Sequence, residues 1–169
     1  MRKAVFFDRD GVLNEERGTY TYRLEDFRVI SDALDVLKKS KSIGYFNIVI
    51  TNQAGIAKGI YTMEEVEKCH QKLQKEVGSR IDDFYIAPDH PDYSMSLSRK
   101  PESLLFEKAI AKYRLDAELC WMIGDKERDL IPAKKLGVKT VLLGGLSSEY
   151  ADFVVDNLKE AGRVIFSEN

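Results

Sequence analysis

The chain has 169 residues, of which 44% are hydrophobic and 32% are charged. This length suits one hydrophobic core, and we expect residues 1–169 to form a single domain. The formal net charge of −2 gives no basic field of the kind that nucleic-acid binding requires. No apolar run approaches the roughly 18 residues of a membrane span, and the 2 cysteines make no secreted disulfide framework. We therefore expect a cytoplasmic protein that binds neither nucleic acid nor membranes.

The first two predicted strands are short apolar runs. Residues 4–7 and residues 46–51 both have the composition of buried strands. The segment between them carries apolar residues at helical spacing, with Ser31 as the expected helix cap and Gly44 as the expected end. The pattern predicts a strand, a helix and a second strand in that order.

A helix and a third strand come next. Thr62 and Glu65 have the spacing of a capping box, which predicts a helix from that point to about Val77. Residues 84–87 then form another apolar run. This part of the chain repeats the strand-and-helix alternation of the first part.

The remaining elements continue the alternation. Pro101 is the expected start of a helix over residues 102–113, which carries apolar residues at helical spacing. A fourth strand ends at about Gly124, the next helix ends at Gly137, and residues 139–143 form a fifth strand before a partly helical C-terminal segment. Five strands, or more, separated by helices predict an α/β fold with a doubly wound, mostly parallel sheet and helices on both faces.

Two carboxylates follow the first predicted strand. Asp8 comes directly after it, and Asp10 lies on the following loop, where Gly11 allows a sharp turn. An aspartate can attack phosphorus to form an aspartyl-phosphate, while a second carboxyl exchanges protons with the leaving group and with water. Such a site needs a divalent cation, and Mg²⁺ suits carboxylate ligands. The Asp-x-Asp-Gly sequence could also form a surface turn. It is not a calcium-binding EF-hand loop, because the spacing of acidic residues that such a loop requires is absent.

Three other strand ends carry residues that complement this pair. Thr51 and Asn52 close the second strand and offer neutral hydrogen-bond donors for a phosphoryl oxygen. Arg99 and Lys100 lie in the loop after the third strand and could neutralise developing charge. Asp125 follows the fourth strand and could complete a magnesium site. Parallel strands bind ligands at their carboxyl ends, so we expect these residues to converge.

The sequence resembles the haloacid dehalogenase superfamily of phosphatases, whose four motifs occur here in order: Asp8-x-Asp10-Gly-Val, Thr51-Asn52, Lys100, and Gly124-Asp125 followed by Asp129. The resemblance implies that Asp8 is the nucleophile and Asp10 the general acid and base. It implies that Thr51 and Lys100 hold the phosphoryl group. It also implies Mg²⁺ bound by Asp8, Asp125 and the backbone carbonyl of Asp10. Asp129 is expected to orient the metal site or Lys100.

The residues around the motifs resemble those of one branch of this superfamily, which contains D-glycero-D-manno-heptose 1,7-bisphosphate 7-phosphatases and histidinol phosphatases. That branch lacks a cap domain, and the short distances between the motifs leave no room for one here. Its substrate is recognised by loops around the site. The substrate contacts that the resemblance implies are Glu16, Arg17, Gly18, Thr19, Asn52, Gln53, Ala54, Arg99 and Lys126.

One feature departs from that branch. Many of its members hold a structural zinc through a Cys-x-His pair and a Cys-x-Cys pair that precedes Arg-Lys-Pro. Here the corresponding positions read Ala87-Pro-Asp89 and Ser96-Leu-Ser98, and His90 is the remaining donor of the usual zinc type. We therefore expect no structural zinc.

The sequence thus predicts a Mg²⁺-dependent phosphatase, a monomer, that acts on a small phosphorylated sugar. A heptose bisphosphate is the expected substrate, and histidinol phosphate is the alternative. A protein that binds a phosphorylated ligand without catalysis is a second alternative, although a binding protein would not need Asp8 and Asp10 together.

Overall fold

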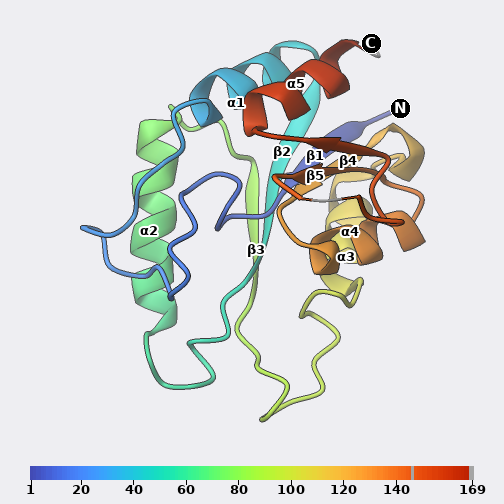
Figure 1. Ribbon diagram of the computed structural model, residues 1–169. Coiled ribbons are helices and arrows are strands. Elements are labelled where there is room, and N and C mark those ends of the chain that lie inside the picture. Colours follow the sequence, from blue (N-terminus) through green and yellow to red (C-terminus); the bar gives the residue numbers. More distant parts are fainter. Residues whose placement is uncertain (146, 168–169) are drawn as a thin grey trace.

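The protein is described here by a computed structural model that covers residues 1–145 and 147–167. Its centre is one parallel sheet of six strands in the order β3-β2-β1-β4-β5-β6 (Figure 1). The strands are β1 (Lys3–Phe7), β2 (Tyr45–Asn52), β3 (Asp83–Ala87), β4 (Trp121–Gly124), β5 (Lys139–Leu143) and β6 (Phe153–Val155). The predicted doubly wound α/β fold is confirmed, with one strand more than the five located in the sequence.

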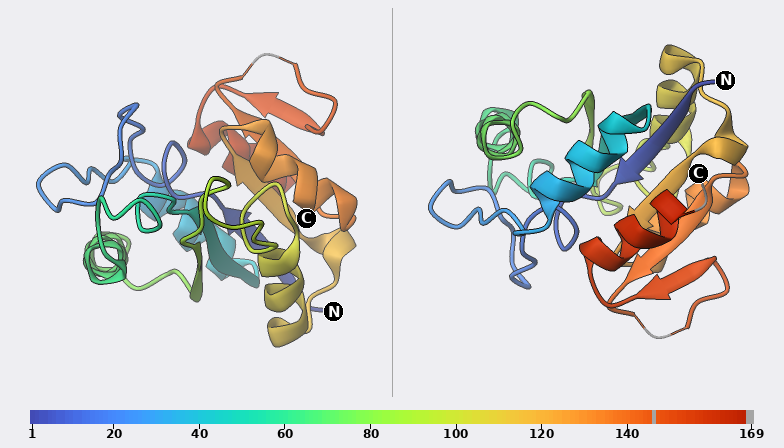
Figure 2. Two further views of the ribbon diagram at one scale, coloured as in Figure 1. Left: turned by 90° about the horizontal axis from the view of Figure 1, so that it is seen from below. Right: turned by 90° about the horizontal axis from the view of Figure 1, so that it is seen from above.

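Helices cover both faces of the sheet because successive strand residues point to opposite sides. Val5 and Phe7 of β1 belong to one hydrophobic cluster and Ala4 and Phe6 to the other. The first cluster is completed by helices α1 (Ala33–Ser42), α2 (Met63–Glu76) and α5 (Leu158–Ser167). The second is completed by α3 (Leu104–Tyr113) and α4 (Glu127–Lys135), with a short 3₁₀ helix (Ala117–Leu119) between α3 and β4. In both views of Figure 2, α2 lies on the opposite side of the molecule from α3 and α4.

The strand order places a crevice beside β1. The chain runs outward from β1 to β2 and β3 on one side and from β4 to β5 and β6 on the other. Open parallel sheets bind ligands outside the carboxyl ends of the strands where this direction reverses. The loops after β2 and β3 extend beyond that edge in Figure 1. None of the helices in the described ranges has the length and apolar character of a membrane span.

Two predicted helix starts are wrong, and local backbone turns explain both. Helix α1 begins at Ala33 after Asp32, not after Ser31, because a turn in which the Ala33 N–H donates to the Ile30 carbonyl (3.0 Å) precedes it. Helix α3 begins at Leu104 and not directly after Pro101. The Glu102 N–H donates to the Arg99 carbonyl (2.9 Å), so Pro101 belongs to a turn.

The other element boundaries agree closely with the sequence patterns. The capping box is present at the start of α2, where the Thr62 side chain accepts from the Glu65 N–H and the Glu65 side chain accepts from the Thr62 N–H. Gly44 and Gly137 both follow helices with positive φ angles of 88° and 81°. Strand β6 was not located in the sequence because it has only three residues and lies at the edge of the sheet.

Candidate active site

The carboxyl ends of β1, β2 and β4 surround a cavity of about 740 Å³. Asp8 lies at its base, directly after β1, and its N–H donates to the carbonyl of Ile123 in β4 (3.0 Å). The residues that line the cavity are Asp8, Asp10, Glu16, Gly18, Thr19, Tyr20, Thr21, Asn52, Gln53, Tyr61, Lys126 and Arg128.

Lys100 reaches the base of this site from the loop after β3. Its ammonium Nζ lies 2.9 Å from Asp8 Oδ1, 2.8 Å from Asp129 Oδ1 and 2.7 Å from the Ile50 carbonyl oxygen. The side chain is buried, which favours the neutral amine, but Asp129 and Asp8 favour the charged form and the pKa of Lys100 is raised. Lys100 is therefore a fixed positive charge beside the Asp8 carboxylate.

The Asp8 carboxylate is buried among other charges. Burial and the negative charge of Asp129 raise the pKa of Asp8 to about 6, and Lys100 partly offsets this rise. At neutral pH the group is mostly ionised. An ionised carboxylate that is poorly hydrated and aimed at a cavity has the properties of a nucleophile.

Asp10 is held by neighbours on both of its oxygens. Oδ1 accepts hydrogen bonds from Arg9 (3.0 Å) and Asn14 (2.9 Å), and Oδ2 accepts from Gln53 Nε2 (3.1 Å). Burial raises the pKa of Asp10, but the Arg9 charge and these hydrogen bonds outweigh burial, so the pKa is lowered overall. Without substrate, Asp10 is an ionised and well-oriented proton acceptor.

Arg9 is a site residue that sequence reasoning missed. Its guanidinium is fully buried, donates to the Thr21 carbonyl (2.7 Å) as well as to Asp10, and lies 5.4 Å from the centre of the Phe27 ring. A buried arginine beside a carboxylate both neutralises charge and fixes geometry. The sequence offered one indication of this role, which is that Arg9 lies between Asp8 and Asp10. An arginine on a loop is ordinarily exposed, so its burial was not expected.

Gln53 and Tyr61 continue the hydrogen-bonded network around Asp10 into the loop between β2 and α2. Gln53 Nε2 also donates to Thr51 Oγ1 (2.8 Å), and Gln53 Oε1 accepts from the Tyr61 hydroxyl (2.8 Å). All three side chains are buried. Burial raises the pKa of Tyr61 to about 12, and its hydroxyl carries its proton at physiological pH, as an ordinary tyrosine does.

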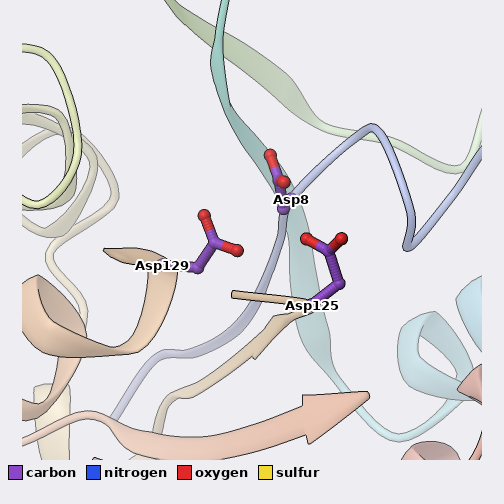
Figure 3. A group of neighbouring side chains, drawn as sticks. All are labelled: Asp8, Asp125 and Asp129. Carbon is purple, nitrogen blue, oxygen red and sulfur yellow. The ribbon is translucent and has the colours of Figure 1, made fainter. Parts of the chain in front are cut away.

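Three carboxylates gather near one point at the base of the site. Asp8, Asp125 and Asp129 have oxygen atoms within 4.8 Å of one another, and Figure 3 shows their side chains turned toward a common space. Asp125 Oδ1 is buried and has no hydrogen-bond partner within the described residues. Carboxylate oxygens are the preferred ligands of hard divalent cations, so this acidic cluster could hold one.

A glycine makes room for the cluster. Gly11 has a φ of 85°, and a Cβ atom at this position would lie 2.5 Å from Asp125 Oδ2. The loop after β1 can therefore pass close to the Asp125 carboxylate only because residue 11 has no side chain. The turn expected at Gly11 is present for both conformational and steric reasons.

The structure brings several of the expected substrate contacts to the cavity. Glu16, Gly18, Thr19, Asn52, Gln53 and Lys126 line it. Several of them also have internal partners, as described above for Gln53. Asn52 exchanges hydrogen bonds with the backbone of Lys100, both at 3.0 Å, and Lys126 contacts Asp125 (2.8 Å) and Glu16 (3.5 Å).

Three of the expected contacts, Arg17, Ala54 and Arg99, are not among the residues that line the cavity. Arg17 is exposed and pairs with Asp26 at 2.9 Å. Ala54 is buried, and its carbonyl accepts from the Lys58 N–H (3.3 Å).

Positive charges line the cavity at Lys126 and Arg128, whereas Arg99 lines a separate, smaller pocket of about 190 Å³. Arg99 is half-buried and donates to the Asp89 carbonyl (3.1 Å). Burial and then the positive charge of Arg128 lower the pKa of Arg99. Arg128 lines the cavity together with Lys126, and sequence reasoning missed it. The sequence could have indicated this role, because Arg128 follows Asp125 by three residues and lies in the first turn of α4.

Hydrogen bonds connect the two parts of the loop after β3, residues 87–89 and 96–98, at which related proteins carry zinc ligands. Ser98 Oγ donates to Asp89 Oδ2 (3.1 Å), and the Ser96 and Ser98 hydroxyls lie 2.8 Å apart. Asp89 therefore contacts both Ser98, through its side chain, and Arg99, through its carbonyl.

Comparisons with known proteins agree with this geometry. The HAD-hydrolase-like family model matches residues 97–161. The D-glycero-beta-D-manno-heptose-1,7-bisphosphate 7-phosphatase of Helicobacter pylori (strain ATCC 700392 / 26695) is 38% identical over 145 residues, which are 83% of each chain. The D-glycero-alpha-D-manno-heptose-1,7-bisphosphate 7-phosphatase of Photorhabdus laumondii is 38% identical over 154 residues, with 83% of this chain and 81% of the relative covered.

Solved structures share the fold. The D,D-heptose 1,7-bisphosphate phosphatase of B. bronchiseptica, solved with magnesium and phosphate, matches with a TM-score of 0.90 at 21% identity and with all of both chains covered. A putative HAD-like phosphatase of Mesorhizobium loti matches with a TM-score of 0.85 at 20% identity, over 98% of this chain and 87% of the other. The sequence relatives and the shared fold together show that the chain belongs to the HAD-like hydrolases and is a phosphatase of that family.

Proposed function

We propose that this phosphatase is a D-glycero-D-manno-heptose 1,7-bisphosphate 7-phosphatase that works through an aspartyl-phosphate on Asp8. The observation that carries the proposal is the Asp8 carboxylate at the base of an open cavity, 2.9 Å from the Lys100 ammonium and next to the oriented Asp10. The names of the relatives from H. pylori and P. laumondii support the substrate.

In the first step, an Asp8 oxygen attacks the phosphorus of the substrate and the bond from phosphorus to the sugar oxygen breaks. Asp10 gives a proton to the departing sugar oxygen. Since Asp10 is ionised without substrate, it has to take up this proton when the substrate binds. The negative phosphate beside it favours that uptake, because a neighbouring like charge raises the pKa of a carboxylate.

In the second step, water attacks the phosphorus of the aspartyl-phosphate while Asp10 accepts a proton from that water. The bond from phosphorus to Asp8 breaks, and inorganic phosphate leaves. In the proposed reaction, Lys100 balances negative charge on the phosphoryl oxygens in both steps, and the Thr51 hydroxyl donates to one of them. Asp10 carries the proton of the water after the second step and returns to its ionised form when it releases that proton as inorganic phosphate leaves.

Mg²⁺ is the cation that we propose for the acidic cluster, held by Asp8, Asp125 and the backbone carbonyl of Asp10. When bound, it neutralises charge between the attacking carboxylate and the phosphate. The unpartnered Asp125 Oδ1 fits this role, as does the excess of carboxylates over ammonium groups at the base of the cavity. Asp129 is paired with Lys100 at 2.8 Å, so we assign it to orienting that lysine.

We propose that the second phosphate of the substrate binds at the rim of the cavity. Lys126 and Arg128 line the cavity and supply positive charge there. Arg99 adds a further guanidinium, whose pKa the charge of Arg128 lowers, and a guanidinium can pair with a phosphate through two parallel hydrogen bonds. The expectations of a monomer in the cytoplasm, formed by one domain without structural zinc and without a nucleic-acid or membrane partner, remain predictions.

Relative specificity tests the proposal. We expect kcat/KM for one anomer of the heptose bisphosphate to exceed that for histidinol phosphate and for p-nitrophenyl phosphate by at least about 100-fold, a transition-state difference of about 2.7 kcal/mol. Asp8→Asn, which keeps the size of the side chain but removes the nucleophile, should abolish turnover of every substrate.

Each other outcome has a clear meaning. A preference for histidinol phosphate would replace the proposed substrate but keep the chemistry. Turnover that survives in Asp8→Asn would exclude the aspartyl-phosphate route. Absence of turnover on every phosphate ester, with Mg²⁺ present, would contradict the proposed reaction altogether.

A further inference from the structure

The side-chain amide of Gln53 is held by three neighbouring side chains: both of its N–H groups donate to them, and its carbonyl oxygen accepts from one of them. Its Nε2 donates one hydrogen to Asp10 Oδ2 (3.1 Å) and the other to Thr51 Oγ1 (2.8 Å), and its Oε1 accepts from Tyr61 (2.8 Å). The side chain is only 2% exposed. Although Gln53 was expected to contact the substrate, its contacts are those of a residue that orients its neighbours.

The bond to Thr51 determines where the hydroxyl proton can point. A threonine hydroxyl has one proton and can also accept hydrogen bonds. Because Thr51 Oγ1 accepts from Gln53, its own proton remains available for another acceptor. At the end of β2 that acceptor would be a phosphoryl oxygen of the substrate.

The bond to Asp10 selects one of its two oxygens. Oδ1 accepts from Arg9 and Asn14, while Gln53 is the one donor to Oδ2 among residues 1–145 and 147–167. A carboxylate oxygen has two lone pairs, so Oδ2 retains one that is free to exchange a proton with the substrate. Gln53 thus holds both the proton donor to the leaving oxygen and the hydroxyl that contacts the phosphate.

Tyr61 supplies the donor that the buried Gln53 carbonyl oxygen requires. The Asp10 carboxylate can only accept, so it fixes the NH₂ end of the amide on its own side and leaves Oε1 facing Tyr61. A buried carbonyl without a donor is unfavourable and would favour other orientations of the amide. The Tyr61 hydroxyl carries its proton at neutral pH, as an ordinary tyrosine does, and burial raises its pKa further, to about 12.

Packing holds the Tyr61 ring in place from several sides. It stacks on Tyr22 at a centroid distance of 4.9 Å and an angle of 16°, and the Tyr20 ring meets it edge-on at 5.6 Å. A Cβ atom on Gly55 would lie 2.0 Å from Tyr61 Cε1, so the ring needs a glycine there. Tyr61 also directly precedes Thr62, the capping residue of α2. The hydroxyl therefore has a well-defined position relative to β2.

We propose that Tyr61 is a positioning residue for catalysis: through Gln53, its hydroxyl holds Asp10 and Thr51 in their reactive orientations. The proposal rests on the phosphatase chemistry given above but not on the heptose substrate. Asp10 and Thr51 act on the transferred phosphoryl group, so the effect should be the same for every phosphate ester.

Tyr61→Phe tests the role because it removes the hydroxyl and keeps the ring. With p-nitrophenyl phosphate we expect kcat to fall about fivefold, which corresponds to about 1 kcal/mol, while KM stays within twofold. Tyr22→Phe is the matched control, since it removes a hydroxyl from the same aromatic stack without touching Gln53, and it should retain the parental kcat. Both variants should melt within a few degrees of the parent.

A double-mutant cycle separates positioning from general destabilisation. Gln53→Ala should lower kcat by more than Tyr61→Phe does, because it loses the bonds to Asp10 and Thr51 directly. If Tyr61 acts through Gln53, then Tyr61→Phe should cause no further loss in the Gln53→Ala background. Losses that multiply, or a Tyr61→Phe variant with the parental kcat, would overturn the proposal.

A measurement without turnover keeps the positioning role distinct from the proposed substrate and reaction. The side-chain NH₂ protons of Gln53 give NMR signals that report on their acceptors. Tyr61→Phe should shift both signals and Tyr22→Phe should shift neither, whichever ester the enzyme hydrolyses. Unchanged Gln53 signals in Tyr61→Phe would refute the positioning role even if the phosphatase reaction is correct.

Discussion

At the scale of single residues, Lys100 explains how charges can be buried at the base of the site. Its ammonium donates hydrogen bonds to Asp8 and to the Ile50 carbonyl and forms an ion pair with Asp129, all within 2.9 Å. Breaking a buried ion pair leaves an uncompensated charge and is strongly destabilising. Because Asp125 adds a further carboxylate nearby, the local charge stays negative and favours a bound cation.

Arg99 is the residue whose replacement should alter substrate preference. Since a bidentate, charge-assisted contact to a phosphate contributes about 1.5–3 kcal/mol, we expect Arg99→Ala to lower kcat/KM for the heptose bisphosphate at least about tenfold more than for p-nitrophenyl phosphate. The comparison of the two kcat/KM values within one protein preparation measures this directly.

The control for lost charge is Arg163→Ala, which removes an exposed arginine from α5. It should leave both kcat/KM values unchanged. Equal losses on the two substrates in Arg99→Ala would mean that Arg99 supports the loop and does not recognise a second phosphate.

At the scale of elements, α2 is tied to β3 through a buried histidine. The His70 ring stacks on Phe84 at a centroid distance of 4.2 Å and an angle of 15°, and its Nε2 has no hydrogen-bond partner within the described residues. Burial, followed by the charge of Arg9, lowers the pKa of His70 to about 3. The helix therefore packs on β3 with a neutral imidazole.

This burial predicts a pH dependence of stability. Because the pKa of His70 in the folded protein is below the unfolded value of about 6.5, its contribution is fully present above that pH and is lost as the pH falls. The parent should lose up to about 1.4 kcal/mol of unfolding free energy per pH unit below 6.5 relative to His70→Gln. Urea unfolding of both proteins at pH 7 and pH 5 measures the difference.

The expected change between these two pH values is about 2 kcal/mol in favour of the variant. Its absolute stability at pH 7 is not the readout, because Gln cannot reproduce the stacking on Phe84. Other titrating groups are common to both proteins and cancel in the comparison. A stability difference that is the same at both pH values would show that His70 protonates without cost in the folded state.

At the scale of the whole molecule, a bound cation should stabilise the fold. The acidic cluster joins the ends of β1 and β4 to the start of α4, and a ligand that binds only the folded state raises the unfolding free energy. Mg²⁺ at 100 times its Kd should add about 2.7 kcal/mol, which raises Tm by about 5–10 °C for a chain of this size. Thermal melts with and without Mg²⁺ measure the shift.

Asp125→Asn provides the control, since it removes one proposed ligand and retains the shape of the side chain. Most of the Mg²⁺-dependent shift should disappear in this variant. If Mg²⁺ raises the Tm of both proteins equally, the cation binds elsewhere.

The sequence by itself determined the fold class and the chemistry of the site. The apolar runs and the helical spacing indicate which residues are buried locally. Because the reactive residues lie at the ends of those runs, the sequence alone places Asp8, Thr51 and Asp125 at strand ends. Helix starts were less certain, because at Ser31 and Pro101 a backbone turn competed with the expected cap.

Only the tertiary structure decided which side chains meet. Lys100 and Asp8 are 92 positions apart in sequence, and their contact depends on the order β3-β2-β1-β4 and on the register between parallel strands. Arg99 in the loop after β3 and Arg128 in α4 likewise come from separate parts of the chain. Local patterns reflect the energetics of nearby residues, whereas these contacts arise from packing across the whole sheet, which no short segment encodes.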